Sequence, residues 1–265
     1  MRIATFNCNS IRTRLDAVLN WLAEYSPDYL CLQETKVQDE DFPLDAFQDA
    51  GWQVAFKGEK SYNGVAIISK KAADEVSFGL DTQPADPPRM IHARFGKLHV
   101  INTYVPQGRD IEHEMYAYKL EWLARLKKYF QARFTTATPL FWCGDLNVAR
   151  HPIDVSNPQT KTNHVCFHQA VRDAFEDVLA FGFTDLFRQH NPDLVDYSFY
   201  DYRVPYRPDR KVGWRIDYVL ATPPLAKKLT HAAIDAAPRA RPKPTHHVPH
   251  YADIQACKHP SQPRR

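Results

Sequence analysis

The fold is decided by the stretch PLFWCGDLNV, which runs from Pro139 to Val148. Apolar and small residues lead directly into Gly-Asp-Leu-Asn, which is the pattern of a buried strand that ends by presenting polar side chains to a cleft. Strand alternation places Asp145 and Asn147 on the same side of the chain. A carboxylate and a carboxamide at a rigid strand end suit a general base and a group that positions its water. A strand followed by an Asx turn accounts for the same residues, so the rest of the chain must decide.

The composition indicates an intracellular protein with a large core. Of the 265 residues, 44% are hydrophobic and 12% aromatic, which is ample for an extensive interior. No apolar run approaches the roughly 20 residues of a membrane span, and no signal peptide precedes the first strand-like pattern. The five cysteines are scattered and have no zinc-site spacing, so we expect reduced thiols and a cytoplasmic location.

The charge distribution gives only a weak indication of the partner. The formal net charge of +3 is too small to identify a polyanionic ligand. Two local clusters, Arg203–Lys211 with its neighbouring tyrosines and Arg239–Lys243, are basic loops. Such loops fit contacts to a phosphate backbone with base stacking, although solvated basic loops are equally common.

Hydrophobic periodicity predicts strands and helices distributed along the whole chain. Strands are expected at Arg2–Asn7, Asp28–Thr35, Trp52–Phe56, Gly64–Lys70, Ile91–Phe95, Lys97–Val105, Pro139–Val148, Trp214–Ala221 and Tyr251–Cys257. Helices are expected at Arg12–Tyr25, Glu112–Phe134 and Phe167–Phe181. Without a repeat or a linker, this mixture predicts one α/β domain over residues 1–257, with two sheets inside and helices outside. Residues 258–265 are expected to form a flexible tail.

Several of the expected strands end in residues of one chemical character. These residues are Asn7, Glu34, Tyr104, Asp145, Asn147, Asp217 and, before the last strand, His247. Strand ends that gather at one edge form a cleft lined by carboxylates, amides, a phenol and an imidazole. Hard oxygen ligands of this kind suit Mg²⁺ or Mn²⁺ better than zinc. A divalent metal, an imidazole and a carboxylate base are the requirements for hydrolysing a phosphodiester.

Six motifs in a fixed order connect the chain with a known family. They are Thr5–Asn7 (TFN), Leu32–Lys36 (LQETK), Tyr62–Ile67 (YNGVAI), Asn102–Pro106 (NTYVP), Gly144–Val148 (GDLNV) and Trp214–Tyr218 (WRIDY). From Met1 to Ile254, the chain resembles the exonuclease III type of abasic-site (AP) endonuclease in the endonuclease/exonuclease/phosphatase superfamily. The resemblance implies an α/β (α+β) fold of the DNase I type, a four-layer sandwich in which helices flank two packed mixed β-sheets.

The resemblance also implies a role for each strand-end residue. Glu34 is expected to bind the metal directly, Asp145 to take the proton of the attacking water, and Asn147 to orient that water. Tyr104 would contact the scissile phosphate, and His247, oriented by Asp217, would stabilise its charge. The full set of expected metal-site residues is Asn7, Glu34, Asp145, Asn147, His246 and His247.

One motif departs from the family. Where the family has Ser-Asp-His, this chain reads Thr245-His246-His247. The loss of the aspartate is expected to weaken Mg²⁺ binding, and the softer nitrogen ligand His246 would favour Mn²⁺.

The remaining expected site residues contact the substrate. Phe199, Trp214 and Ile216 match the apolar pocket in which the family holds a flipped, base-less sugar, although the same residues also fit an ordinary core. The other expected substrate contacts are Lys36, Gln107, Arg109, Lys161, His164 and Arg203.

The sequence therefore predicts a DNA repair nuclease that acts on duplex DNA with abasic or 3′-blocked sites. We expect a monomer that uses Mg²⁺ or Mn²⁺, with no organic cofactor and no membrane association. It would cleave 5′ to the abasic site and also show 3′-5′ exonuclease or 3′-end-clearing activity. Two alternatives remain: another phosphoesterase of the superfamily, such as a non-specific nuclease or a lipid or inositol phosphatase, and a catalytically weakened protein that binds damaged DNA.

Overall fold

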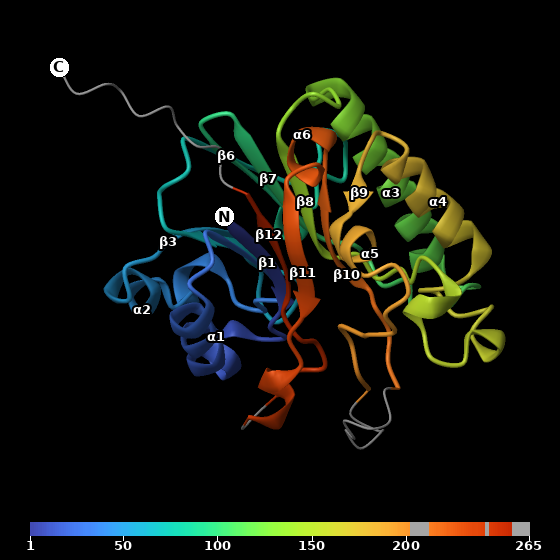
Figure 1. The fold of residues 1–265 in the computed structure, drawn as a ribbon, viewed down its shortest axis with the longest axis horizontal. Helices are drawn as coiled ribbons and strands as arrows, with labels where there is room; N and C mark the ends of the chain where they lie inside the picture. The colour runs from blue at the N-terminus through green and yellow to red at the C-terminus, as the bar shows by residue number, and fades with distance from the viewer. Residues whose placement is uncertain (202–211, 242–243, 256–265) are drawn as a thin grey trace.

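The protein is a sandwich of two six-stranded sheets with helices on both outer faces (Figure 1). The computed structural model describes residues 1–201, 212–241 and 244–255. In Figure 1, α1 (Ile11–Tyr25) and α2 (Leu44–Asp49) lie on one side of the sheets, and α3 (Glu114–Arg133) and α4 (Gln169–Leu179) lie on the other. This arrangement confirms the expected four-layer fold.

Both sheets mix parallel and antiparallel pairs. The first sheet has the order β11-β12-β1-β2-β4-β3, and the second has the order β5-β6-β7-β8-β10-β9. β1 and β2 are parallel, as are β7 and β8, while the remaining neighbours are antiparallel. The first sheet comprises β1 (Arg2–Asn7), β2 (Tyr29–Gln33), β3 (Gln53–Lys57), β4 (Val65–Ser69), β11 (Leu229–Ile234) and β12 (His250–Ile254). The second comprises β5 (Glu75–Phe78), β6 (Met90–Phe95), β7 (Leu98–Tyr104), β8 (Leu140–Asp145), β9 (Thr184–Asp185) and β10 (Asp217–Ala221).

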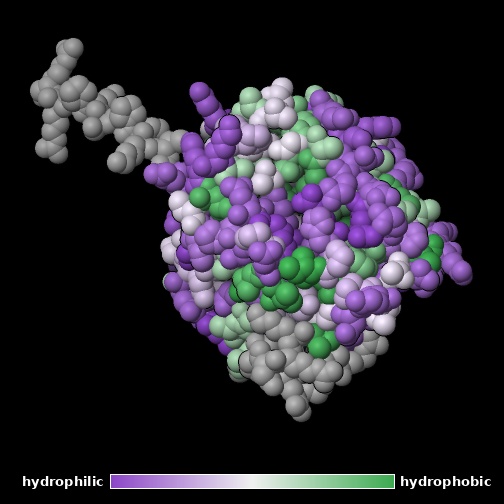
Figure 2. Space-filling view, turned by 45° about the vertical axis from the view of Figure 1, so that its right-hand side comes forward, coloured by the Kyte–Doolittle hydropathy of each residue, from purple (hydrophilic) through white to green (hydrophobic). Residues whose placement is uncertain are grey.

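Hydrophilic residues cover most of the face shown in Figure 2, where an apolar patch lies near the centre. Over the parts of the chain that the structure describes, every helix is too short or too polar to cross a membrane. The short helices are α5 (Leu186–His190), α6 (Pro223–Ala226) and the 3₁₀ turns Asp39–Asp41, Pro87–Arg89, Pro152–Asp154, Pro158–Thr160 and Ala237–Ala240.

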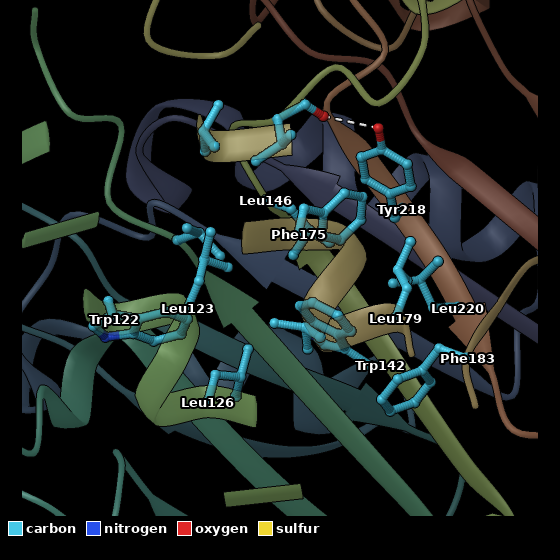
Figure 3. Close-up of a cluster of buried hydrophobic side chains, with 14 of the residues drawn as sticks. Trp122, Leu123, Leu126, Trp142, Leu146, Phe175, Leu179, Phe183, Tyr218 and Leu220 are labelled. Atoms are coloured by element: carbon cyan, nitrogen blue, oxygen red, sulfur yellow. Dashed lines mark hydrogen bonds between the residues drawn. The ribbon is translucent and has the colours of Figure 1, made fainter. Parts of the chain in front are cut away.

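Three hydrophobic cores correspond to the three interfaces between the four layers. Between the sheets, small and β-branched side chains such as Val65 and Val100 interdigitate. Behind the first sheet, Trp21 of α1 packs in the core that also contains Phe6 of β1. Behind the second sheet, α3, α4 and the strands β8 and β10 share an aromatic-rich core (Figure 3). The labelled members of that core are Trp122, Leu123, Leu126, Trp142, Leu146, Phe175, Leu179, Phe183, Tyr218 and Leu220.

The expected elements are present with small shifts at their ends. The largest shifts are of three residues: the strand expected over Trp214–Ala221 begins only at Asp217, and the one expected over Pro139–Val148 already ends at Asp145. Trp214 forms an isolated bridge with Phe199. The sequence reading missed β5, β9, β11, α2, α5 and α6. β5 has only four residues, all of them exposed, and its short polar and apolar alternation from Glu75 to Phe78 was a signal that the sequence prediction did not use. Residues 258–265 and the last two residues of the expected strand Tyr251–Cys257 lie outside the described residues.

The register brings the polar strand ends together. Asp145 is paired with Tyr104 on one side and with Asp217 on the other. In the first sheet, Asn7 at the end of β1 is paired with Gln33 at the end of β2. Since β1 and β8 also contact each other across the sandwich, both groups of strand ends face one site.

Candidate active site

A cleft of about 430 Å³ opens where these strand ends meet. One side of its lining is polar and ionisable, whereas the other is aromatic and aliphatic. The lining residues are Glu34, Tyr104, Gln107, Asp145, Asn147, Lys161, His164, Cys166, Phe199, Asp201, Trp214, Ile216 and His247.

Three of these residues form a group that could hold a metal ion. One ligand atom from each of Glu34, Asp145 and His247 lies within 4.8 Å of the others. Glu34 follows β2 in a left-handed backbone conformation, with φ of 51°, and Lys36 Nζ lies 2.7 Å from its Oε2. Two carboxylates and one imidazole fit a small divalent cation that prefers oxygen ligands.

The two carboxylates of this group have opposite pKa shifts. Burial raises the pKa of Asp145 to about 7; the charge of nearby His247 opposes this rise, and the charge of Asp217 adds to it. Burial also acts on Glu34, but hydrogen bonds from Lys36 and Asn7 outweigh it and lower the Glu34 pKa. Asp145 is therefore a carboxylate whose proton affinity lies near neutral pH, as a general base requires.

His247 and Asp217 form a buried ion pair. His247 Nδ1 lies 2.8 Å from Asp217 Oδ2, and His247 Nε2 lies 3.7 Å from Asp145 Oδ2. Burial alone would lower the pKa of His247, but the charges of Asp217 and Asp145 outweigh it and raise the pKa to about 9. The ring is thus a cation at neutral pH, with one nitrogen fixed by Asp217 and the other directed toward the cleft.

Asn147 reaches the cleft by a different route from the one predicted. The strand ends at Asp145, and Asn147 has a left-handed backbone with φ of 52°. Its backbone N–H donates to Asp145 Oδ1 at 3.0 Å, which is an Asx turn, and its side-chain amide donates to Val105 O at 3.0 Å. The Asx turn is therefore confirmed, and the strand alternation expected to continue to Asn147 is wrong; the side chains of Asp145 and Asn147 both line the cleft.

Asn7 and His246 do not take the places expected of metal ligands. Asn7 Oδ1 accepts a hydrogen bond from the backbone of Asn9, so its amide nitrogen faces the carboxylates, at 2.8 Å from Glu34 Oε1 and 2.9 Å from Asp145 Oδ2. The Asn7 amide nitrogen thus bridges the two carboxylates, and its oxygen does not face the place where a metal ion would lie between them. The ring of His246 stacks on Phe199, with centroids 5.5 Å apart and planes 6° apart, and it lies outside the group of three.

The aromatic side of the cleft is built on backbone pairing between distant segments. Phe199 and Trp214 exchange two backbone hydrogen bonds of 2.8 and 2.9 Å. The ring of His164 lies 4.4 Å from the Trp214 ring, and Lys161 Nζ lies 5.8 Å from the same ring. Ile216, at 4% exposure, completes this wall.

The remaining expected substrate residues are distributed unevenly. Gln107 lines the cleft, and its side-chain oxygen accepts from the backbone of Arg109 at 2.6 Å. Arg109 is exposed and lies outside the lining, and Lys36 contacts Glu34 and Asn9 rather than the cleft. Tyr104 lines the cleft; burial and the nearby charges of Glu34 and Asp145 hold its pKa well above the usual range. Arg203 lies outside the described residues.

Sequence reasoning missed two lining residues and the polar supports behind the site. Cys166 and Asp201 line the cleft, and their only sequence signal was their closeness to His164 and Phe199. Between the sheets, the Asn102 amide donates to the carbonyls of Leu32 and Ala66, at 2.8 and 2.9 Å. Asn102 belongs to the second sheet and both acceptors to the first, so this buried amide fixes the end of β2, and hence Glu34, relative to β8.

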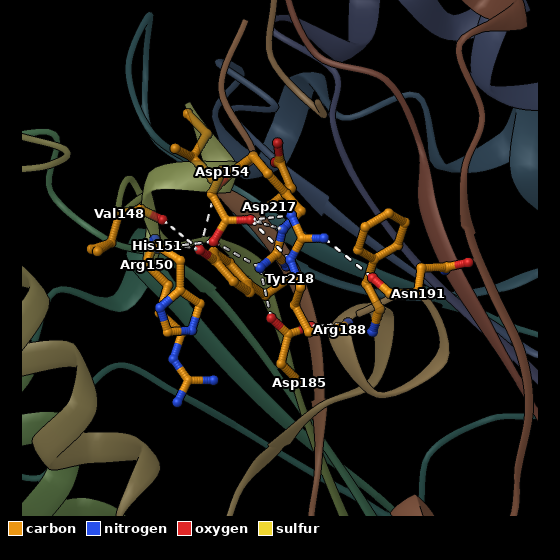
Figure 4. A network of polar contacts seen from close by, with 12 residues as sticks. Val148, Arg150, His151, Asp154, Asp185, Arg188, Asn191, Asp217 and Tyr218 are labelled. Atoms are coloured by element: carbon orange, nitrogen blue, oxygen red, sulfur yellow. Dashed lines mark hydrogen bonds and ion pairs between the residues drawn. The ribbon is translucent and has the colours of Figure 1, made fainter. Parts of the chain in front are cut away.

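A second buried polar cluster includes Asp154, Asp185 and Arg188 (Figure 4). Arg215 contacts Asp154 at 2.8 Å and Asp185 at 2.8 Å, and Arg188 also pairs with Asp154. The backbone N–H of Arg215 donates to Asp154 O at 2.7 Å. This ion network fixes the segment from Trp214 to Asp217, and with it two sides of the cleft.

The comparisons with known proteins agree with this geometry. Residues 4–245 match the model of the endonuclease/exonuclease/phosphatase family. The chain belongs to that family. Within it, the chain is 35% identical to an exodeoxyribonuclease of Bacillus subtilis over 241 residues, covering 89% of this chain and 94% of the relative.

Solved structures of family members have the same fold. An AP endonuclease from Archaeoglobus fulgidus superposes with a TM-score of 0.95 and 48% identity, covering 97% of this chain and 100% of that one. A 3′ phosphatase from Neisseria, solved with a product DNA hairpin, superposes with a TM-score of 0.90 and 35% identity, again covering 97% and 100%. The resemblance seen in the sequence is thereby confirmed.

Proposed function

We propose that the protein is a divalent-metal-dependent DNA repair nuclease that hydrolyses the phosphodiester 5′ to abasic sites in duplex DNA. The observation that carries this proposal is the position of Asp145, a carboxylate with a pKa near 7 that lies within 4.8 Å of Glu34 and His247. The activities named for its relatives, AP endonuclease, exodeoxyribonuclease and 3′ phosphatase, support a DNA substrate and an additional activity at 3′ ends.

In the proposed reaction, Asp145 removes the proton from the attacking water, and Asn147, fixed by the turn to Asp145, orients that water. The His247 cation lies on the same side of the cleft and stabilises the negative charge that gathers on the phosphate oxygens in the transition state. Tyr104 keeps its proton at neutral pH because of its raised pKa and can donate a hydrogen bond to the phosphate. Glu34 and Asp145 would hold Mg²⁺ or Mn²⁺, which when bound would act as a Lewis acid on the phosphate; the protonated ring of His247 has no lone pair to offer the cation.

We assign substrate selection to the aromatic wall. Phe199, Trp214 and Ile216 form an apolar surface beside the acidic group, and an unpaired sugar without a base can enter such a space at less cost than a paired nucleotide. Lys161 and Gln107 lie at the rim, where contacts to the phosphate backbone would fix the register of the DNA. The ring of His164 packs against Trp214 on this side of the cleft, with the two ring planes tilted by 34°.

The decisive experiment compares the cleavage of a duplex with one tetrahydrofuran site and of the same duplex without damage, over titrations of Mg²⁺ and Mn²⁺. We expect incision 5′ to the tetrahydrofuran to be at least about 100-fold faster than incision of the intact duplex. Equal rates would instead identify a non-specific nuclease. Tight binding to the damaged duplex without cleavage in either metal would identify a damage-binding protein. A 3′-phosphate-terminated duplex, tested in parallel, measures the end-clearing activity.

A further inference from the structure

Lys119, in the middle of α3, is a cation buried entirely inside the protein. Its side chain is 0% exposed, although it belongs to a helix whose other lysines lie toward solvent. Its ammonium group donates three hydrogen bonds, to Gln107 O at 3.1 Å, Asn147 O at 2.7 Å and Val165 O at 2.9 Å. All three acceptors are backbone carbonyls.

The three carbonyls belong to three separate loops that border the cleft. Gln107 follows β7, Asn147 follows β8, and Val165 lies between His164 and Cys166 in the loop before α4. Gln107, Asn147, His164 and Cys166 all line the cleft. One ammonium group therefore joins loops that are 18 or more positions apart in the sequence and that together form one wall of the site.

Stability alone is a poor reason for a lysine at this position. Removing an ammonium group from water is costly, and the partners of Lys119 are three uncharged carbonyls. Burial lowers the pKa of Lys119, which shows that the surroundings disfavour its charge. What the charge provides is three strong hydrogen bonds that converge on one point, one of them to the residue with a left-handed backbone, Asn147.

We propose that Lys119 is a positioning residue for cleavage: it fixes the peptide of Asn147, and with it the water-orienting side chain, relative to Asp145. Lys119 does not touch the substrate. This inference rests on the proposed function, since it assumes that the cleft is where the phosphodiester is cleaved. It makes no use of Glu34, whose strand is fixed separately by Asn102.

The same helix offers a matched control. Arg125, with 9% exposure, is also a buried cation of α3, and its Nη1 donates to the backbone carbonyl of Pro84 at 2.6 Å. Its Nη2 lies 3.7 Å from Oδ2 of Asp86. Neither Pro84 nor Asp86 lines the cleft. Replacing Arg125 thus removes a buried cation and a bond to a carbonyl without loosening the loops of the site.

The test compares Lys119→Met with Arg125→Met in the full chain, with activity measured at a temperature well below the melting point of both variants. We expect Lys119→Met to reduce kcat for the tetrahydrofuran duplex by about 10- to 100-fold, because small errors in orientation are costly for a reaction that depends on alignment. Duplex affinity measured without divalent metal, and the Mg²⁺ concentration for half-maximal cleavage, should each stay within about threefold of the wild type. Arg125→Met should keep kcat within about threefold of the wild-type value, even if it lowers the melting temperature as much as Lys119→Met does.

Three outcomes would overturn the proposal. The first is an unchanged kcat in Lys119→Met; the second is an equal loss of kcat in both variants, which would indicate general destabilisation. If Lys119→Met does not fold, Lys119→Arg decides, because a planar guanidinium cannot reproduce three bonds that converge on one atom. Its kcat should fall by about three- to tenfold, and wild-type kcat in this variant is the third contrary result. A wild type that cleaves no DNA would instead reject the proposed function and is recognised before any variant is compared.

Discussion

Two buried polar clusters lie next to each other in this protein, and they shift the pKa of a buried aspartate in opposite directions. Asp154 belongs to the ion network of Arg215, Arg188 and Asp185, in which two arginines face two aspartates. Asp145 belongs to the active-site cluster, which consists of Glu34, Asp145, Asp217 and His247. Its nearest cation there is His247, whose ring is already paired with Asp217. Both aspartates are almost inaccessible, at 0% and 1% exposure.

The comparison shows that burial does not by itself set the charge state of an acid. Burial raises the pKa of Asp154, but the charges and hydrogen bonds of Arg215 and Arg188 outweigh it and lower the pKa to about 2. For Asp145, burial prevails and the pKa rises to about 7. In the ion network, the charges of two arginines and two aspartates are paired within the protein. The active-site cluster has an excess of acid over base, and such an excess in a cleft indicates a site that binds a cation or moves a proton.

The largest effect that follows from this comparison is on activity. Asp145→Asn should reduce cleavage of the tetrahydrofuran duplex by at least about 10³-fold, because the amide cannot accept the proton of the attacking water. The same variant should be as stable as the wild type or more stable at pH 8 in the absence of divalent metal. The sign follows from the pKa: a folded value of about 7, above the ordinary 3.8, means that ionised Asp145 is disfavoured in the folded state at pH 8.

Rates from single-turnover cleavage and unfolding curves in urea measure these two effects. A strongly destabilised Asp145→Asn would show that the carboxylate supports the fold as Asp154 does, and the contrast between the clusters would be lost. Glu34→Gln is the matched control: its pKa is lowered, so its ionised form is favoured in the folded state, and the substitution should not stabilise the protein.

The second effect is on stability. Asp154→Asn should lower the free energy of unfolding by about 3–5 kcal/mol at pH 7, because it leaves Arg215 buried and without its main counter-charge. In the wild type, the folded protein lowers the Asp154 pKa from the ordinary 3.8 to about 2. The ionised carboxylate therefore contributes fully to the free energy of unfolding above about pH 4, and this contribution is lost as the pH falls toward 2. That contribution corresponds to about 2 kcal/mol.

Urea unfolding at pH 7 and over the range from pH 4 to 2 tests this prediction. The variant should show a shallower fall in stability over the acid range than the wild type. Its kcat, measured below its melting temperature, should fall by far less than that of Asp145→Asn, because Asp154 acts on the cleft only through the segment from Trp214 to Asp217. An undiminished free energy of unfolding would contradict the role assigned to the network.

The sequence predicted the residues of the active-site cluster but not those of the ion network. Glu34, Asp145, Asp217 and His247 lie at strand ends or beside them, and strand ends can be recognised from hydrophobic patterns. Their carboxylate and imidazole side chains also indicated one function, the hydrolysis of a phosphodiester. Asp154 and Arg188 carry no such signal, because a charged residue in a loop or a short helix normally lies in water. Only the folded chain shows that the charges of the ion network pair across segments 30 or more positions apart.

Lys119 and Asn147 illustrate the same limit at the cleft itself. In sequence, Lys119 is one of several lysines in a polar helix, and only packing distinguishes the buried one from the exposed ones. Asn147 was predicted correctly as a cleft residue, but from strand alternation, whereas a left-handed turn delivers it. The family resemblance predicted the fold and the order of the motifs; the orientation of Asn7 and the position of His246 depend on side-chain contacts that motifs do not encode.

The smallest effect concerns His246, where the family aspartate is absent. His246→Asp places a carboxylate beside the active-site cluster and adds to its excess of acid, so the Mg²⁺ concentration for half-maximal cleavage should fall, by about two- to threefold. The effect is small because the histidine ring lies on Phe199, outside the group formed by Glu34, Asp145 and His247.

The substitution also removes that stack, which would change the apolar wall independently of charge. His246→Asn separates the two contributions, since it loses the stack without adding a charge and should leave the Mg²⁺ requirement unchanged. Identical Mg²⁺ titrations for the wild type and His246→Asp would show that position 246 has no influence on the cation, and that the histidine belongs to the aromatic wall alone.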